Sequence, residues 1–334
     1  MVTQAQIAEK LGVSRQLVTF ALAGYPQVSV ESRQRILAAA QEMGYRPNPL
    51  ARALRRGRTG IIALWIPDQI SSHYAHVARE LNLLVKQANK ELIVSEIGSK
   101  HAEEVLSHVA VDGIIAVDAP EQTHAYLQSS SARLVPIVSM GADCWEKTDF
   151  VQVDLLAGTV KVMEHLINSG FKRILHVTFW RKDAPQASRR MGYGRAMREA
   201  GLKPQFLYYK ASHRQRLVVR QLIQDHLRGK DRPDAIFCHS DDVALGVYRG
   251  LCDMGVRVPA EVALVGCDGI QDTEYLECPL TTLVQPVSAM CTTAWHFLEQ
   301  RLSNASINRQ SAILMPILQI RESSCRQYQP VALV

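Results

Sequence analysis

Apolar residues at helical spacing open the chain and predict three short helices. These cover about residues 4–10, 15–23 and 30–43, and a glycine that can end a helix lies at or just beyond each one. Thr3 and Gln6 have the spacing of a capping box, which satisfies free backbone groups at a helix start. The inward positions are Ile7, Ala8, Leu11, Leu17, Val18, Ala21, Leu22, Ile36, Leu37, Ala40 and Met43. Two short helices joined by a tight glycine turn, with a third in support, indicate a helix-turn-helix.

The second of these helices would enter the major groove of DNA, with Ser14 as its N-cap. Its outward side chains are Arg15, Gln16, Thr19 and Phe20. Arginine can contact a guanine edge, glutamine an adenine, and an exposed phenylalanine a thymine methyl group. Two other interpretations stay open, namely a helical cap that binds nothing and a Phe20 that packs against Tyr25 or the hinge.

A short basic segment follows at residues 48–57. Asn48 is a good N-cap, Pro49 suits the first helical position, and Gly57 suits the end. The helix would have about nine residues, fewer than the ~12–15 that are stable alone in water, so we expect it to fold only with support. Leu50 and Leu54 lie on one face among arginines, the layout of a helix that wedges an apolar side chain between base pairs in the minor groove.

Beyond residue 60 the pattern changes to short continuous apolar runs separated by amphipathic helices. The predicted strands are 61–66, 92–97, 113–117 and 134–139 in one set, then 173–178, 235–238 and 262–266 in another. The predicted helices are 74–90, 155–169, 187–200, 241–254 and 287–302. Continuous apolar strands alternating with helices are typical of parallel sheets covered on both faces. The pattern therefore predicts two doubly wound α/β lobes.

Charge separates these two parts of the chain. Residues 1–60 hold nine Lys or Arg against three Glu, so the whole formal net charge of +6 lies there, and the other residues balance to zero. A basic module on a neutral body indicates that the module binds a polyanion. A solvated basic face is the alternative that charge alone leaves open.

Composition narrows the class of protein further. The chain has 334 residues, 47% of them hydrophobic, but no apolar stretch of the ~18 residues that span a membrane. The start lacks the pattern of a secretory signal, and seven scattered cysteines without a C-x-x-C pair indicate reduced, buried thiols. We therefore expect a cytoplasmic protein that binds no membrane.

Polar residues directly after the predicted strands are the candidate ligand contacts, because doubly wound sheets bind ligands at the carboxyl ends of their strands. This group comprises Asp68, Ser240, Asp241 and Asp268, and Arg189 opens the helix after the strand at 173–178. Arginine and aspartate can fork onto vicinal hydroxyl groups. For each residue, a structural cap or a surface charge remains the alternative.

Several linked motifs in one order closely resemble the LacI/GalR family of bacterial regulators. They include "IAEKLGVSRQLVTFALAG", "VSVESRQRILAAAQEMGYRPNPLARALRRGRTG", "SRRMGYGRAMREAGL", "PDAIFCHSDDVALG", "RVPAEVALVGCDG" and "PLTTLVQPV", and the resemblance covers residues 3 to about 325. It implies a homodimer that reads a palindromic operator, with Leu54 as the intercalating hinge leucine. It also implies an effector between the lobes of a periplasmic-binding-protein-like domain.

The resemblance divides the chain at specific positions. It implies a headpiece at 1–47, a hinge helix at 48–58, and a body at 59–334 whose lobes are about 60–158 with 287–314 and 159–286 with 315–328. The expected DNA contacts are Thr3, Ser14, Arg15, Gln16, Thr19, Phe20, Asn48, Leu50, Ala51, Leu54 and Arg55. The expected effector contacts are Asp68, His73, Tyr74, Trp180, Arg189, Ser240, Asp268 and Gln285.

Departures from the family pattern affect mainly the ligand. Phe20 stands where the family often has a polar residue, Ser240 where Asn is usual, and Gly269 where a second Asp is common. Thr178-Phe179-Trp180 replaces the usual glycine pair and would narrow the cleft. These changes weaken the case for a common hexose, although an aromatic ring such as Tyr74 still offers a face for a sugar.

Three other classes of function compete with this interpretation. An enzyme would show a motif such as G-x-G-x-x-G after a strand, a Walker phosphate-binding loop or a G-x-S-x-G nucleophile elbow, and the sequence contains none of the three. A zinc site at His73 and His76 lacks a convincing third ligand. A transport protein would need a signal peptide and no basic headpiece, and a regulator whose pocket has lost its ligand stays open. We expect a repressor controlled by a sugar or sugar derivative, with no metal, no cofactor and no enzymatic activity.

Overall fold

The computed structural model describes residues 2–45, 58–97, 110–129, 135–179, 188–210, 212, 214–229 and 231–326. The chain divides into two compact units, Met1–Thr59 and Gly60–Val334, and each is described on its own. The hinge residues Asn48, Leu50, Ala51, Leu54 and Arg55, as well as Trp180, lie outside the described ranges.

The first unit is a bundle of three helices around a small apolar core. The helices are α1 (Gln4–Leu11), α2 (Arg15–Ala23) and α3 (Val30–Glu42). Thr3 and Gln6 form the predicted capping box, and Ser14 Oγ accepts a hydrogen bond from Leu17 N at 3.1 Å. Gly12 and Gly24 end their helices in the left-handed region, where an L side chain would be strained. The helix-turn-helix prediction is confirmed.

The core of this bundle differs from the prediction at one face of α3. Its fully buried side chains are Ile7, Ala8, Val18, Ala21, Val28, Ile36, Ala39 and Ala40. The prediction that Leu37 faces inward is wrong, because this side chain is 45% exposed and Ala39 takes its place in the core. Leu17 and Leu22 are only partly buried. Ala40 is buried as predicted, whereas the burial of Ala39 was not indicated by the periodicity of the larger residues.

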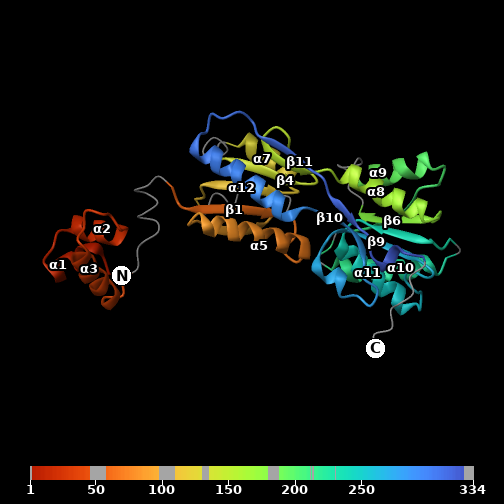
Figure 1. The fold of residues 1–334 in the computed structure, drawn as a ribbon, viewed down its shortest axis with the longest axis horizontal. Helices are drawn as coiled ribbons and strands as arrows, with labels where there is room; N and C mark the ends of the chain where they lie inside the picture. Colours follow the sequence, from red (N-terminus) through yellow and green to blue (C-terminus); the bar gives the residue numbers. More distant parts are fainter. Residues whose placement is uncertain are drawn as a thin grey trace. The chain divides into compact units, whose positions relative to one another are not determined.

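The first lobe of the second unit is a six-stranded parallel sheet between helices (Figure 1). Its order is β11 (Ser311–Leu314), β5 (Asp149–Val153), β4 (Ile137–Gly141), β3 (Gly113–Val117), β1 (Ile61–Ile66) and β2 (Glu91–Glu96). The helices α5 (Ser72–Gln87) and α12 (Val287–Ser303) pack on one face. Tyr126 of α7 (Pro120–Gln128) packs on the other face, against Trp65.

The second lobe repeats this arrangement, except that its edge strand β12 is antiparallel (Figure 1). The order is β12 (Ile317–Gln319), β10 (Thr281–Val284), β9 (Ala263–Asp268), β8 (Ala235–Cys238), β6 (Ile174–Phe179) and β7 (Gln205–Tyr209). One face is covered by α10 (Gln215–Leu227) and α11 (Asp241–Asp253), and the other by α8 (Leu155–Asn168) and α9 (Ser188–Glu199). Two doubly wound sheets confirm the predicted fold class.

The chain passes between the two lobes three times. It does so at Asp154 between β5 and α8, at Gln285-Pro286 between β10 and α12, and at Met315-Pro316 between β11 and β12. The crossing at Gln285 places this residue directly beside the cleft that separates the lobes.

Two further findings concern the predicted class of protein. All seven cysteines are free, and four are buried, but Cys252 is exposed, so the prediction of buried thiols is wrong for that residue. Within the described ranges, every helix is too short or too polar to cross a membrane.

Candidate ligand-binding site

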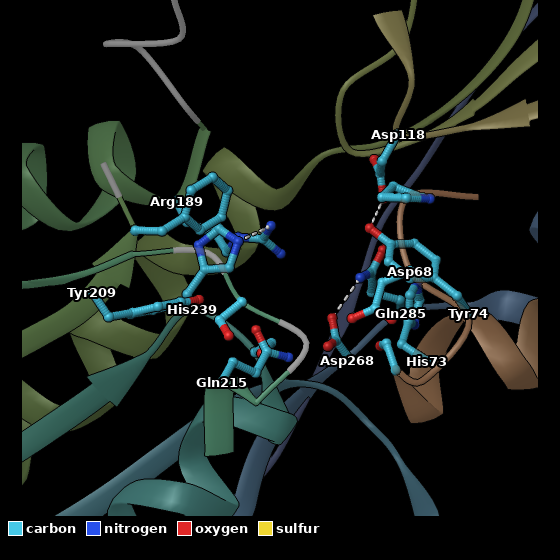
Figure 2. A pocket seen from close by; sticks show the side chains of 15 residues that line it. Asp68, His73, Tyr74, Asp118, Arg189, Tyr209, Gln215, His239, Asp268 and Gln285 are labelled. Carbon is cyan, nitrogen blue, oxygen red and sulfur yellow. Dashed lines mark hydrogen bonds between the residues drawn. The ribbon is translucent and has the colours of Figure 1, made fainter. Parts of the chain in front are cut away.

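A cavity of about 560 Å³ lies between the two lobes, at the carboxyl ends of their parallel strands. Figure 2 shows side chains from both lobes converging on it. Of the predicted effector contacts, the described ones all line this cavity, namely Asp68, His73, Tyr74, Arg189, Ser240, Asp268 and Gln285. The volume lies within the ~300–1,000 Å³ typical of pockets for small molecules.

On the first-lobe wall, Asp118 holds a carboxylate at the end of β3. Its Oδ1 accepts hydrogen bonds from Ala142 N at 2.7 Å and Asp143 N at 3.0 Å, and its Oδ2 accepts one from the Tyr74 hydroxyl at 3.1 Å. The backbone of Asp118 is left-handed, with φ of 46°. Such strained positions concentrate at ligand sites, where the surrounding structure enforces them. The first lobe therefore presents a fixed anion and a fixed phenol ring.

Gly141 allows this close approach of the chain to Asp118. Its φ is 121°, and a Cβ built on it would overlap the Asp118 carboxylate. We expect Gly141→Ala to displace Asp118, weaken ligand binding and lower the melting temperature. Gly201→Ala is the matched control, since Gly201 is also left-handed with φ of 67° but faces open space. The control should cost only the ~1–2 kcal/mol of backbone strain. Equal melting temperatures and ligand affinities for the two variants would contradict this role of Gly141.

On the second-lobe wall, Arg189 is held by two neighbours. Its Nη2 lies 2.8 Å from His239 Nε2, and its Nη1 donates to Cys267 Sγ at 3.6 Å. Because an arginine only donates, His239 Nε2 must accept, so the imidazole is neutral with its proton on Nδ1, 3.3 Å from Thr178 Oγ1. Burial lowers the pKa of His239 well below its ordinary value, and Arg189 lowers it further.

Asp268 ends β9 between these walls, with a left-handed φ of 130°. Gln285 Nε2 donates a hydrogen bond to Asp268 Oδ1 at 2.8 Å, and the backbone N–H of Gln285 donates one to the carbonyl oxygen of Asp268 at 3.1 Å. Burial raises the pKa of Asp268 to about 7, against the opposing effect of Arg189. Since Gln285 uses its amide nitrogen on the carboxylate, its Oε1 is left buried without a partner.

Asp241 and Ser240 stabilise this wall from behind. Asp241 is fully buried and accepts hydrogen bonds from Gly269 N at 2.7 Å, Ile270 N at 2.9 Å and Thr282 Oγ1 at 2.7 Å. It therefore fixes the turn after Asp268 and does not line the cavity. Ser240 Oγ accepts a hydrogen bond from Val243 N at 3.2 Å and so caps α11. Ser240 is therefore a structural cap, the alternative left open for it, and it also borders the cavity.

His73 and Asp68 are two further predicted effector contacts, and both also contact residues of their own lobe. His73 is 4% exposed, its ring packs edge-on against Tyr74, and its Nε2 is buried without a partner. Burial lowers the pKa of His73, so the ring is neutral at physiological pH. Asp68 Oδ1 accepts a hydrogen bond from Ile70 N at 2.8 Å, which closes a local turn at the cavity rim.

Comparison with known proteins identifies the family. Residues 4–48 match the family described as bacterial regulatory proteins, lacI family, and residues 163–324 match the periplasmic binding protein-like domain. The NTD biosynthesis operon regulator NtdR of Bacillus subtilis is 30% identical over 342 residues, covering 97% of this chain and 100% of the relative. The chain belongs to the lacI family of bacterial regulatory proteins.

Other lacI-family proteins extend this comparison. The ribose operon repressor of Haemophilus influenzae is 28% identical over 333 residues, covering 97% of this chain and 98% of the relative. The solved lac repressor dimer, bound to operator and the anti-inducer ONPF, is 21% identical with a TM-score of 0.80, covering 97% of this chain and 99% of that one. At that identity the likeness shows the shared fold.

The cavity is also lined by residues that the sequence did not predict as effector contacts. Asp118 follows strand β3 directly, so the reasoning that selected Asp68 and Asp268 could have found it. His239 precedes Ser240, but its role depends on the contact with Arg189 from another helix. Tyr209 and Gln215 border the cavity without any sequence signal that marked them.

In the headpiece, Arg15 and Gln16 are exposed on the first turn of α2. Thr19 Oγ1 donates within the headpiece, to Gln4 Oε1 at 2.9 Å and to the Arg15 carbonyl at 3.0 Å. Phe20 is partly buried, and its ring contacts Tyr25 edge-on at 5.2 Å between centroids. The alternative packing of Phe20 against Tyr25 is thus present, and its contact with DNA stays a prediction.

Proposed function

We propose that this lacI-family chain is a repressor that binds a palindromic operator as a homodimer. In this proposal a sugar or sugar derivative, bound in the cavity between the lobes, controls the affinity for the operator. The observation that carries the proposal is a cavity lined by Arg189 and three aspartates in a chain whose basic headpiece exposes Arg15 and Gln16.

Polar groups with unused hydrogen-bonding capacity argue for a working ligand site. Asp268 lines the cavity at 7% exposure, and among the described residues only its Oδ1 receives a side-chain hydrogen bond. An unsatisfied buried polar group costs about 1–3 kcal/mol, which a ligand with matching hydrogen bonds would offset. A regulator without a ligand would have no reason to keep this carboxylate in the cavity, so this alternative is less favoured.

The chemistry of the walls supports a polyhydroxylated ligand. Arg189 retains N–H donors beyond the two that face His239 and Cys267, and Asp268 and Asp118 supply acceptors. Vicinal hydroxyl groups donate and accept, so one sugar can satisfy both kinds of group. The rings of Tyr74, Tyr209 and Phe179 border the same space. The H. influenzae relative, a ribose operon repressor, agrees with control by a sugar.

The headpiece supports binding to DNA. Its excess of basic residues suits the phosphate backbone, and two exposed side chains on the first turn of α2 suit base edges in the major groove. The solved lac repressor dimer of the same fold is bound to operator. Curated relatives of this chain are regulators, which supports a role outside catalysis.

The test is a titration of the full chain on DNA selected for tight binding from a random library. Light scattering should give a dimer at micromolar concentration, and the selected sites should be palindromic. A panel of sugars should then include one that changes operator affinity and raises the melting temperature, since a ligand at 100 times its Kd adds ~2.7 kcal/mol of stability. Selected DNA that is no better bound than random DNA would refute the proposal. Operator binding that no sugar alters would instead favour a regulator without an effector.

A further inference from the structure

Negative charge exceeds positive charge in the described lining of the cavity. The carboxylates of Asp68, Asp118 and Asp268 line it, whereas the guanidinium of Arg189 is the one permanent cation among the described lining residues. The two lining histidines, His73 and His239, both have pKa values lowered by burial and therefore add no charge at neutral pH. Among these described residues, a bound neutral sugar would leave the excess of negative charge unchanged.

The two charges are also separated in space. Figure 2 shows Arg189 together with His239 on one side of the cavity, and Asp68, Asp118 and Gln285 on the other. Arg189 and Asp268 form no ion pair, although each influences the pKa of the other. Arg189 Nη2 lies 2.8 Å from His239 Nε2. On the side of the carboxylates, no described lining residue carries a permanent positive charge.

The free hydrogen-bonding capacity on the carboxylate side is acceptor-rich. Oδ2 of Asp268 and Oδ2 of Asp68 receive no hydrogen bond from any described residue. Asp268 is only 7% exposed, so water reaches its carboxylate poorly. Two free carboxylate oxygens beside an excess of negative charge favour a ligand group with several N–H donors and a positive charge.

We propose, on the basis of the function proposed above, that the effector is a sugar with an ammonium group, which Asp268 binds while Arg189 binds hydroxyl groups at the opposite wall. A protonated amine carries three donors and one charge, so it matches both deficits of the carboxylate side. An acidic sugar would add repulsion to the charge already present and is excluded by the same reasoning. Burial raises the pKa of Asp268 to about 7 despite the opposing effect of Arg189, which agrees with a carboxylate that is short of counter-charge.

The test uses matched sets of sugars on the full-length protein. Glucose, galactose and mannose are each compared with their 2-amino-2-deoxy and uronic acid forms by thermal shift and calorimetry at pH 7. We expect one aminated sugar to bind at least about tenfold more tightly than its neutral parent, the difference typical of a charge-assisted hydrogen bond, and no uronic acid to bind. A neutral sugar that binds as tightly as its amine, binding of a uronic acid, or no binding by any amine would overturn the inference.

Two variants test whether Asp268 causes the preference for the aminated sugar. Asp268→Asn keeps the size and shape of the side chain at this φ of 130°, so it should fold and reduce the preference for the amine to about twofold or less. Asp272→Asn, at an exposed carboxylate outside the cavity, should retain the full preference. An unchanged preference in Asp268→Asn would overturn the assignment. A neutral sugar that alters operator affinity would overturn the inference but leave the proposed function intact, whereas indifference of operator binding to every sugar would count against both.

Discussion

Arg189→Ala is expected to weaken binding of the effector by about 10- to 100-fold, while operator binding without effector stays unchanged. The range follows from the loss of a buried, charge-assisted hydrogen bond, worth about 1.5–3 kcal/mol. Arg189 opens α9 and is held in place by His239 and Cys267, so its free donors are oriented before a ligand arrives. The side chains that we expect to read bases belong to a separate unit, which is why operator affinity should be retained.

Two further variants isolate the cause. Arg195→Ala removes a guanidinium from the same helix, but Arg195 pairs with Glu199 on the exposed side, and its loss should change effector affinity by less than about twofold. Arg189→Lys keeps the charge and loses the planar fork, so it should restore little of the affinity. If Arg189→Ala binds the effector as the wild type does, then the residue serves only to position His239.

Arg189→Ala should also change how the stability of the folded protein depends on pH. The pKa of Asp268 rises on folding from 3.8 to about 7, so Asp268 contributes stability that is present below pH 4 and lost as pH rises through 7. Arg189 opposes this rise, and its removal should move the pKa of Asp268 higher. Arg189→Ala should therefore continue to lose melting temperature between pH 7 and 9, where the wild type changes less. In the double variant with Asp268→Asn, this additional loss should disappear.

The fold was predictable because its apolar runs are long and bounded by clear breaks. Strands β1, β3 and β8 occupy the predicted residues, since continuous burial on both faces leaves an uninterrupted apolar run. The edge strands β7, β11 and β12 were missed, because they are only partly buried and lack a continuous apolar run. The interior strands β5 and β10 were missed as well, since Asp149, Gln152 and the two threonines of β10 interrupt the apolar pattern. Helix α7 was missed as well, since its inner face is formed by Thr123 and Tyr126 and lacks an aliphatic stripe. Helix α10 was also missed, although its buried Val219, Ile223 and Leu227 have the helical spacing that could have predicted it.

The site was predictable as far as strand ends and family motifs reach. Asp68, Asp268 and Arg189 all line the cavity, as expected from their places after strands. The sequence could not distinguish Asp268 from Asp241, since both follow strands, and only their hydrogen bonds assign Asp241 to the turn behind the wall. The neutral state of His239 depends on a contact between residues 50 positions apart, which no local pattern contains.

The second large effect concerns the headpiece. Arg15→Ala is expected to reduce affinity for the operator by about 10- to 100-fold, equivalent to the 1–3 kcal/mol of a specific base contact, and to relax preference at one base pair of each half-site. Arg15 is exposed on the first turn of α2, beside Gln16, and Ser14 fixes the start of that helix through its cap on Leu17 N. The cap fixes the backbone of the turn that carries Arg15.

Lys10→Ala is the matched control for Arg15→Ala, because Lys10 is a headpiece cation that pairs with Glu42 at 2.9 Å. Its removal should weaken operator and random DNA alike and by less than about threefold, since an exposed pair contributes little. Fluorescence anisotropy on operator and on scrambled DNA, at two salt concentrations, separates the two cases. A phosphate contact lowers the affinity for all sequences and flattens the salt dependence, whereas a base contact lowers the affinity for operator selectively. Equal losses on both DNAs for Arg15→Ala would assign Arg15 to the phosphate backbone, and Gln16 would then be the remaining candidate on that turn for reading a base.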